Sequence, residues 1–248
     1  MNNLGLFIIG NGFDREHNLP TSYWDFRKYV LTLYPKAESY YFVPESTLMP
    51  KGNEEYDEEE VAGYIVNIID SCRDGWWSEL EAYLGEDVYE AFLEDLPAVN
   101  TDDDECFHDV YTNEDLSKHI LNTFVGVKDL FVDWVKTRLS NIDFSGIEKP
   151  EIETIIDSNG AFLSFNYTKT LELGYGINED QVCHIHGSVD NLSDEIIMGH
   201  GNDEPIIESL SSMGTEVSFG ELKRRLRKDT AGIIQKNKDF FKQLSDVQ

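Results

Sequence analysis

The chain has 248 residues, enough for one large domain, and its apolar share of 40% with 12% aromatic residues indicates a folded core. Its 48 acidic and 20 basic residues give a net charge of −28. Such an acidic surface disfavours binding to nucleic-acid backbones and attachment to anionic membranes.

Cysteine usage and hydropathy together predict a cytoplasmic protein. Cys72, Cys106 and Cys183 are odd in number and form no CxxC pair, as expected for reduced thiols. No basic leader precedes the first apolar run, and no apolar run is long enough to span a membrane.

The chain opens MNNLGLFIIGNGFD, in which the apolar residues 4–9 predict a strand buried on both faces of a parallel sheet. The glycines that follow permit a positive φ or the close approach of another group. Ligands bind outside the carboxyl ends of parallel strands, so this loop is a candidate nucleotide contact. It lacks the third glycine of GxGxxG and the Gly-Lys of a P-loop, so a tight structural turn is the alternative. The candidate residues are Gly10, Asn11, Gly12, Phe13 and Asp14.

The middle of the chain is predominantly helical. Ser22 and Asp25 predict a capping box before the apolar stripe of YWDFRKYVLTLY. Two segments rich in acids, 43–60 and 99–105, are typical of loops. Further helices are expected over 59–72, over 76–96 with a bend near Gly85, and over 113–141.

After Pro150 the pattern changes to short apolar runs, which predict strands over 161–165, 181–186 and 196–201 and a short helix from Thr170. Each run ends in polar or glycine residues: FNYT, HIHGS and GHG. Strands separated by helices favour a parallel sheet, whose carboxyl ends share one edge. A common crevice is therefore predicted for Asp14, Asn166, Tyr167, His184, His186, Gly187, Ser188 and His200.

His184 and His186 stand two apart, so within one strand their side chains would share a face. That arrangement suits a metal site completed by His200 or Asp190, a general base, or a buried core histidine. Asn166 has the alternative role of capping the following helix.

One stretch near the end of the chain is basic, unlike the rest of the sequence. Residues 223–228, KRRLRK, hold five of the 20 basic residues. On a helix these would form a cationic face, which we expect to meet the protein's own carboxylates. A phosphate or a partner's acidic surface is the alternative.

The segments FIIGNGFDREHNLPTSYWDF, WSELEAYL, FLSFNYTKTLE, HIHGS and IIMGHG resemble the AbiH family of bacterial phage abortive-infection proteins. This resemblance touches nearly the whole chain in order and implies a role in phage defence. It also implies a phage-derived or host protein as trigger.

A more distant similarity links GNGFD, FNYT and HIHGS to sirtuin-like NAD-binding domains, many of which hydrolyse NAD in phage defence. It implies that Gly10, Asn11 and Gly12 approach the phosphates. Asn166 would orient a water or the ribose, and His186 would act as a base. Sirtuin zinc motifs are absent, so deacylation is not expected, and neither is a resident metal.

The resulting prediction is a single α/β domain over 1–248 with a Rossmann-like (sirtuin-like) parallel sheet and a large helical insertion. Its parts are a nucleotide-binding core (1–21 and 150–204), the insertion (22–149) and a C-terminal helical segment (205–248). We expect it to bind, and to be able to hydrolyse, a nucleotide such as NAD. The alternatives are a non-catalytic nucleotide-sensing or protein-interaction module and a metal-dependent hydrolase; homo-oligomerisation stays open.

Overall fold

A computed structural model describes residues 5–39, 42–50, 54–72, 77–85, 89, 92–93, 96, 99, 106–147, 156, 160–192, 195–201 and 213–245. The chain divides into two compact units. Unit 1 comprises Met1–Asp25, Val132–Met198 and Asp229–Gln248, and unit 2 comprises Phe26–Phe131 and Gly199–Lys228.

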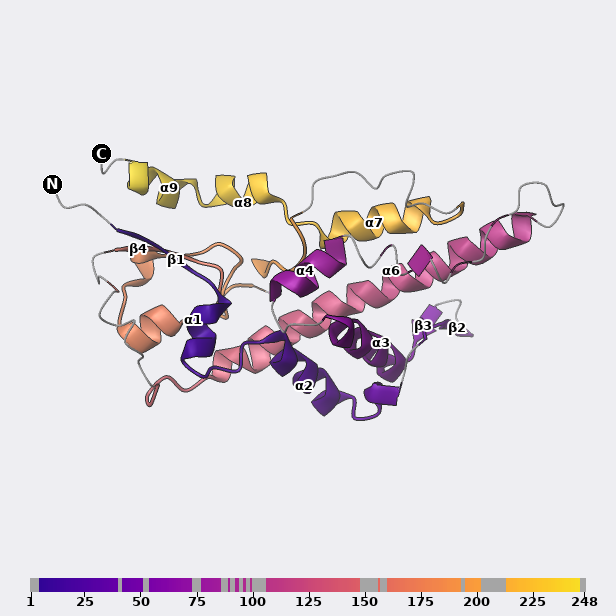
Figure 1. Ribbon diagram of the computed structural model, residues 1–248, viewed down its shortest axis with the longest axis horizontal. Helices are drawn as coiled ribbons and strands as arrows, with labels where there is room; N and C mark the ends of the chain where they lie inside the picture. Colours follow the sequence, from indigo (N-terminus) through magenta and orange to yellow (C-terminus); the bar gives the residue numbers. More distant parts are fainter. Residues whose placement is uncertain are drawn as a thin grey trace. The chain divides into compact units, whose positions relative to one another are not determined.

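The described elements alternate between strands and helices in the first unit and are mostly helical in the second (Figure 1). The strands are β1 (Leu6–Ile9), β2 (Ser46–Leu48), β3 (Glu54–Tyr56), β4 (Ala161–Ser164) and β5 (Val182–His184). The α-helices are α1 (Asn11–Glu16), α2 (Tyr23–Leu33), α3 (Glu58–Ser71), α4 (Trp77–Gly85), α6 (Cys106–Thr137), α7 (Glu216–Leu226), α8 (Thr230–Lys236) and α9 (Lys238–Ser245). Single-turn elements are η1 (Ala37–Ser39), η2 (Leu139–Asn141), the π-helix η4 (Thr170–Gly174) and η5 (Glu179–Gln181).

Unit 1 is built on a three-stranded sheet in the order β1-β4-β5, and both strand pairs are parallel. Ile9 is paired with Ser164, and Ser164 with His184, so all three strands end level with one another. One face of the sheet is covered by an apolar cluster, in which the rings of Phe7 and Phe162 stack with centroids 5.1 Å apart. The buried members of this cluster are Ile9, Phe13, Phe162, Leu171 and Ile177. The prediction of a mixed α/β fold with a parallel sheet is therefore confirmed.

Two predictions about strands are wrong. β1 is not buried on both faces, because the side chains of Leu6 and Ile8 are 46% and 68% exposed at the edge of the sheet. Residues 196–201 form no strand. Only His200 makes an isolated parallel bridge, to Arg227, and GHG therefore does not follow a strand.

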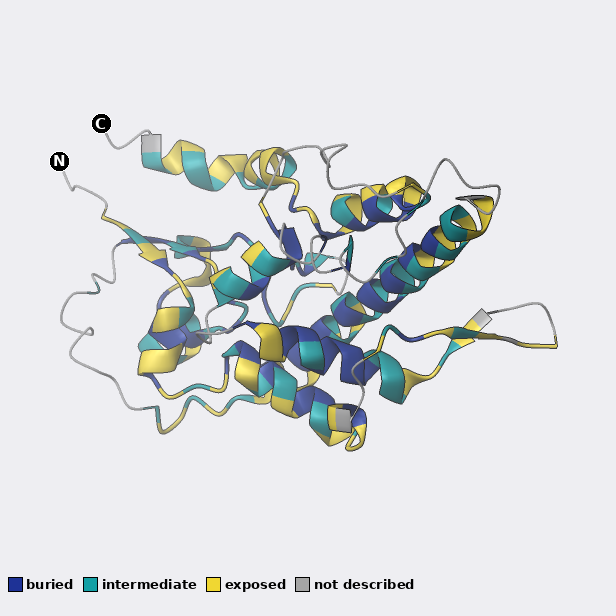
Figure 2. Ribbon diagram, turned by 45° about the vertical axis from the view of Figure 1, so that its right-hand side comes forward, coloured by how far each residue is buried: buried dark blue, intermediate teal, exposed yellow. Residues whose placement is uncertain are grey.

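Unit 2 packs its helices around an aromatic core. Phe131 contacts Phe26 and Trp77 edge-on, with ring centroids 5.5 and 5.3 Å apart. α4 and α7 are in contact, and buried residues run along most of α3 (Figure 2). The predicted helices are confirmed over most of their described lengths, but the expected loop 43–60 contains the antiparallel hairpin of β2 and β3.

The basic run over residues 223–228 meets the protein's own carboxylates, as predicted. On α7, Glu221 accepts from Arg224 at 2.7 Å and from Arg225 at 2.6 Å. Lys228, which is 8% exposed, is paired with Glu81 of α4. Within the described ranges, none of the helices combines the length and the apolar character needed to cross a membrane.

Candidate functional site at the carboxyl edge of the sheet

The loops that follow β1, β4 and β5 meet at one edge of the sheet in unit 1. Because the strands are parallel and end level, the chain leaves all three in the same direction. The side-chain amide of Asn166 donates from Nδ2 to the Gly10 carbonyl at 3.1 Å. Thus the first and second loops, which are 156 residues apart in sequence, are joined directly.

The two glycines of the first loop have no conformational reason to be glycine. Neither Gly10 nor Gly12 has a positive φ, and a Cβ atom added to either would meet no atom of the described part of the chain within 4 Å. Both are exposed. Between them, Asn11 accepts from the Thr21 hydroxyl at 2.8 Å, while its buried Nδ2 has no hydrogen-bond partner among the described residues.

Asp14 is turned into the protein. Its side chain is 1% exposed and accepts from Thr168 Oγ1 at 2.6 Å and from Thr170 Oγ1 at 2.8 Å. Burial raises the pKa of this carboxyl above its ordinary value, although the two threonine hydroxyls and Asn166 oppose the rise. Asp14 therefore fixes the loop after β4 to α1.

Phe13 also belongs to the interior, since it is part of the apolar cluster beneath the sheet. Behind it, His17 Nδ1 lies 2.6 Å from the Phe13 carbonyl, which accepts only, so this nitrogen carries the proton. His17 Nε2 forms a second hydrogen bond, 2.5 Å long, with the hydroxyl of Tyr175. This contact ties α1 to the residue that follows η4.

His184 is held between two hydrogen-bond acceptors. Its Nδ1 lies 2.8 Å from the Asn166 carbonyl oxygen, and its Nε2 lies 2.8 Å from Glu172 Oε1. A ring that donates from both nitrogens is an imidazolium. Burial alone lowers the pKa of His184, but the bond and charge of Glu172, with the Asn166 carbonyl, outweigh it and raise the pKa.

The raised pKa of His184 favours the imidazolium form of this ring in a pair whose side chains, His184 and Glu172, are 12% and 6% exposed. An imidazolium has no lone pair for a metal ion or for a proton. Asp190, an alternative third ligand under the metal hypothesis, is paired with Lys169 at 2.7 Å. Among the described residues, no group of three or more His, Cys, Asp or Glu side chains is arranged to hold a metal ion.

β5 ends at His184, so His186 stands in the turn that follows, and the prediction that the two histidines share a strand face is wrong. His186 is half-buried, and its ring packs edge-on against Phe165, with centroids 5.2 Å apart. Phe165 is 40% exposed and directly follows β4. An aromatic pair therefore borders the edge beside Asn166.

Gly187 and Ser188 shape the turn that carries His186. Gly187 has φ +84°, and a Cβ there would lie 2.8 Å from the Glu195 carbonyl oxygen, so only glycine fits. Ser188 is buried, and both its amide and its hydroxyl donate to Asn191 Oδ1, at 2.7 and 3.1 Å. Gly187 and Ser188 therefore stabilise the conformation of the loop that contains them.

Tyr167 and His200 complete the predicted set. The Tyr167 hydroxyl donates to the Ile197 carbonyl at 2.7 Å, which anchors the loop after β4 within unit 1. His200 belongs to unit 2, where it is buried beside Gly85 and exchanges backbone hydrogen bonds with Leu226 and Lys228. It is a packing residue of that unit.

Sequence reasoning missed Thr168, Thr170 and Glu172 as partners of the charged groups. The two threonines stand two and four residues after Asn166, and an isolated acid in the apolar stretch LELG is the one signal for Glu172. Neither signal identifies the partner, because Asp14 and His184 are distant in sequence.

Comparison with known proteins assigns the chain to a family. A family model described as Bacteriophage abortive infection AbiH matches residues 6–248. Neither the search of curated proteins nor that of solved structures gave a significant match. Since the family match covers nearly the full length, the chain belongs to the AbiH family of bacteriophage abortive infection proteins.

Proposed function

We propose that the carboxyl edge of the sheet binds a dinucleotide such as NAD and hydrolyses its bond between nicotinamide and ribose. The observation that carries the proposal is the open space at Gly10 and Gly12. The fold itself does not require glycine at either position. Glycine in a helix costs about 1 kcal/mol relative to alanine, and Gly12 lies within α1. A pyrophosphate lying against bare backbone accounts for that cost.

The geometry of the edge supports the following roles for Asn166 and His186. Asn166, whose Nδ2 is engaged by Gly10, keeps its Oδ1 as the atom that accepts from the attacking water or a ribose hydroxyl. Water adds to C1′ of the ribose as the C1′–N bond breaks, and the bonding electron pair leaves with neutral nicotinamide. His186 takes the proton that the water releases. An aligned water and hydrogen bonds to the ribose hydroxyls stabilise the oxocarbenium-like transition state.

Asp14 would oppose this proposal if its charge faced the pyrophosphate. Its burial against Thr168 and Thr170 removes that objection, because the carboxyl is directed into the protein.

The proposal is tested by incubating the purified protein with NAD and measuring free nicotinamide by chromatography. We expect release by the wild-type protein and at least a hundredfold slower release by His186→Ala, as is typical when a general base is removed. His119→Ala, which changes a histidine of unit 2, is the matched control and should retain activity. Intact NAD in the presence of wild-type protein that still protects cells from phage would favour a non-catalytic sensing or interaction module.

A further inference from the structure

A cavity of about 620 Å³ lies within unit 2, in the size range of pockets that hold small molecules. One stripe of α3 forms its wall, because Tyr64, Asn67, Ile68 and Ser71 follow the i, i+3, i+4, i+7 spacing of a single helix face. Leu116 and Ile120 of α6 are a second pair at helical spacing. The wall is therefore set by two regular helices.

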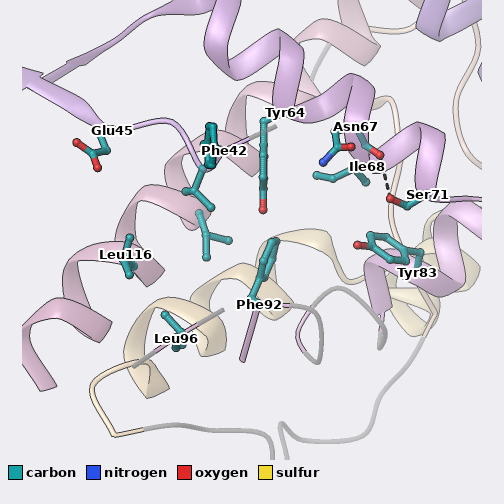
Figure 3. A pocket seen from close by; sticks show the side chains of 12 residues that line it. Phe42, Glu45, Tyr64, Asn67, Ile68, Ser71, Tyr83, Phe92, Leu96 and Leu116 are labelled. Carbon is teal, nitrogen blue, oxygen red and sulfur yellow. Dashed lines mark hydrogen bonds between the residues drawn. The ribbon is translucent and has the colours of Figure 1, made fainter. Parts of the chain in front are cut away.

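Rigid aromatic rings form the centre of the cavity, as Figure 3 shows. Tyr64 and Phe92 stack with an interplanar angle of 21°, and each also packs edge-on against Phe124. Both are nearly fully buried, at 6% and 5% exposure. By contrast, the Phe42 ring is 85% exposed at this cavity, which leaves a large apolar surface for a ligand to cover.

Three of the polar side chains that line the cavity are those of Glu45, Ser71 and Tyr83. Glu45 is at one end of the view in Figure 3, and Ser71 and Tyr83 are at the other. None of the described residues that line the cavity is a lysine, arginine or histidine. Among these described residues Glu45 is the one charged side chain, and its carboxylate repels a phosphate.

The electrostatic field around the cavity is negative, like the charge of Glu45. More than half of the chain's acidic residues lie between residues 26 and 131, the main segment of unit 2. A surplus of one charge attracts ligands of the opposite charge and repels those of the same charge. Aromatic faces add a preference for cations, because the ring quadrupole is negative above and below its plane.

We propose that this cavity is a binding site for a small organic cation with an aromatic or aliphatic body. The apolar body contacts Tyr64, Phe92 and Phe42, and the positive group is directed towards Glu45. The site is distinct from the sheet edge and makes unit 2 the part of the chain that responds to a second ligand.

Three probes of matched size and different charge test the proposal: benzyltrimethylammonium, benzyl alcohol and benzenesulfonate. Saturation-transfer NMR with the full chain should detect the cation most strongly, the alcohol weakly and the sulfonate not at all. Glu45→Gln should weaken binding of the cation by about threefold, as expected for one exposed charge, and leave the alcohol unchanged.

A pocket-filling variant locates the binding. Ser71→Trp places a large ring in the cavity, and Ser140→Trp is the control, because both serines are exposed and donate to the carbonyl four residues earlier. Loss of the cation signal in Ser71→Trp alone supports the site. Equal signals from benzenesulfonate, or a cation signal unchanged in Ser71→Trp with native thermal unfolding, would overturn it.

Discussion

Substitution of the glycines at the sheet edge can distinguish a requirement of the fold from a requirement of ligand binding. Gly12→Ala fits the helical backbone and open space of α1, so the free energy of unfolding should stay unchanged or rise by up to about 1 kcal/mol. NAD cleavage should fall by at least tenfold, because a methyl group occupies the approach of the pyrophosphate. Urea denaturation and nicotinamide release measure the two effects separately.

Gly187→Ala is the matched comparison. Here the left-handed backbone and the Glu195 carbonyl leave no room for a Cβ, so stability should fall by about 1–3 kcal/mol. Loss of stability in both variants would mean that Gly12 serves the fold, and the proposal for the first loop would fail.

The ion pair of His184 with Glu172 makes stability depend on pH in a defined direction. A histidine with a raised native pKa contributes stability that is complete below its unfolded value, about 6.5, and is lost as pH rises through the native pKa. Glu172→Gln leaves a buried imidazolium unpaired and should cost about 3 kcal/mol at pH 6. We expect that difference to shrink at higher pH. Denaturation of both proteins from pH 6 upward checks it; a constant difference would show a neutral ring.

The buried carboxyl of Asp14 makes stability fall with rising pH as well, but over a more acidic interval. Because burial raises its native pKa, the wild-type protein loses stability as pH rises from the ordinary aspartate range, about 3.8, through the raised value. Asp14→Asn should therefore gain stability relative to wild type over that interval. Asp143, whose pKa is lowered by the Ser145 amide, is the control, and Asp143→Asn should lose stability relative to wild type as pH rises. Parallel pH profiles for the two variants would contradict this assignment.

Among the site residues, position at a strand end could be predicted from sequence, but the direction of a side chain could not. The runs before Gly10 and Asn166 ended where expected, because apolar length and glycine mark the end of a strand. Whether Asp14 faces a ligand or the interior depends on Thr168, a partner 154 residues away. No local pattern contains that information.

At the scale of elements, the capping box of α2 gives a direct stability test. Ser22 and Asp25 bond reciprocally, with Ser22 N donating to Asp25 Oδ2 at 3.1 Å and Asp25 N to Ser22 Oγ at 3.2 Å. Ser22→Ala should lower the free energy of unfolding by about 1 kcal/mol. Ser140→Ala, at an exposed serine that is not a helix N-cap, should change it by less than about 0.5 kcal/mol. Equal effects in thermal or urea unfolding would show that the box does not stabilise α2.

Helices were more predictable than strands for a physical reason. The stripes of α2, α3 and α6 repeat over three or more turns, so each carries many independent positions. The hairpin of β2 and β3 has only three residues a strand and few apolar side chains, so its loop-like composition concealed it. Residues 196–198 have the composition of a strand but pair with no strand, because a backbone bond from Ile197 to the His186 carbonyl joins them to a turn.

For the whole molecule, the order of motifs predicts a mixed α/β fold in which a parallel sheet carries the candidate site. The division of the chain could not be read from that order: residues 199–228 return to unit 2 after the sheet is complete. Family membership supports a role in abortive infection, and the chemistry at the sheet edge is the proposal that gives this role a mechanism.

The most direct measurement is a crystal structure of the protein with carba-NAD. In this analogue a carbon replaces the oxygen of the nicotinamide ribose ring, so no oxocarbenium ion can form. We predict density for the pyrophosphate against Gly10–Gly12 and for the nicotinamide ribose within hydrogen-bonding reach of Asn166 and His186. Density for the analogue elsewhere, or an unoccupied sheet edge at saturating analogue, would contradict the account.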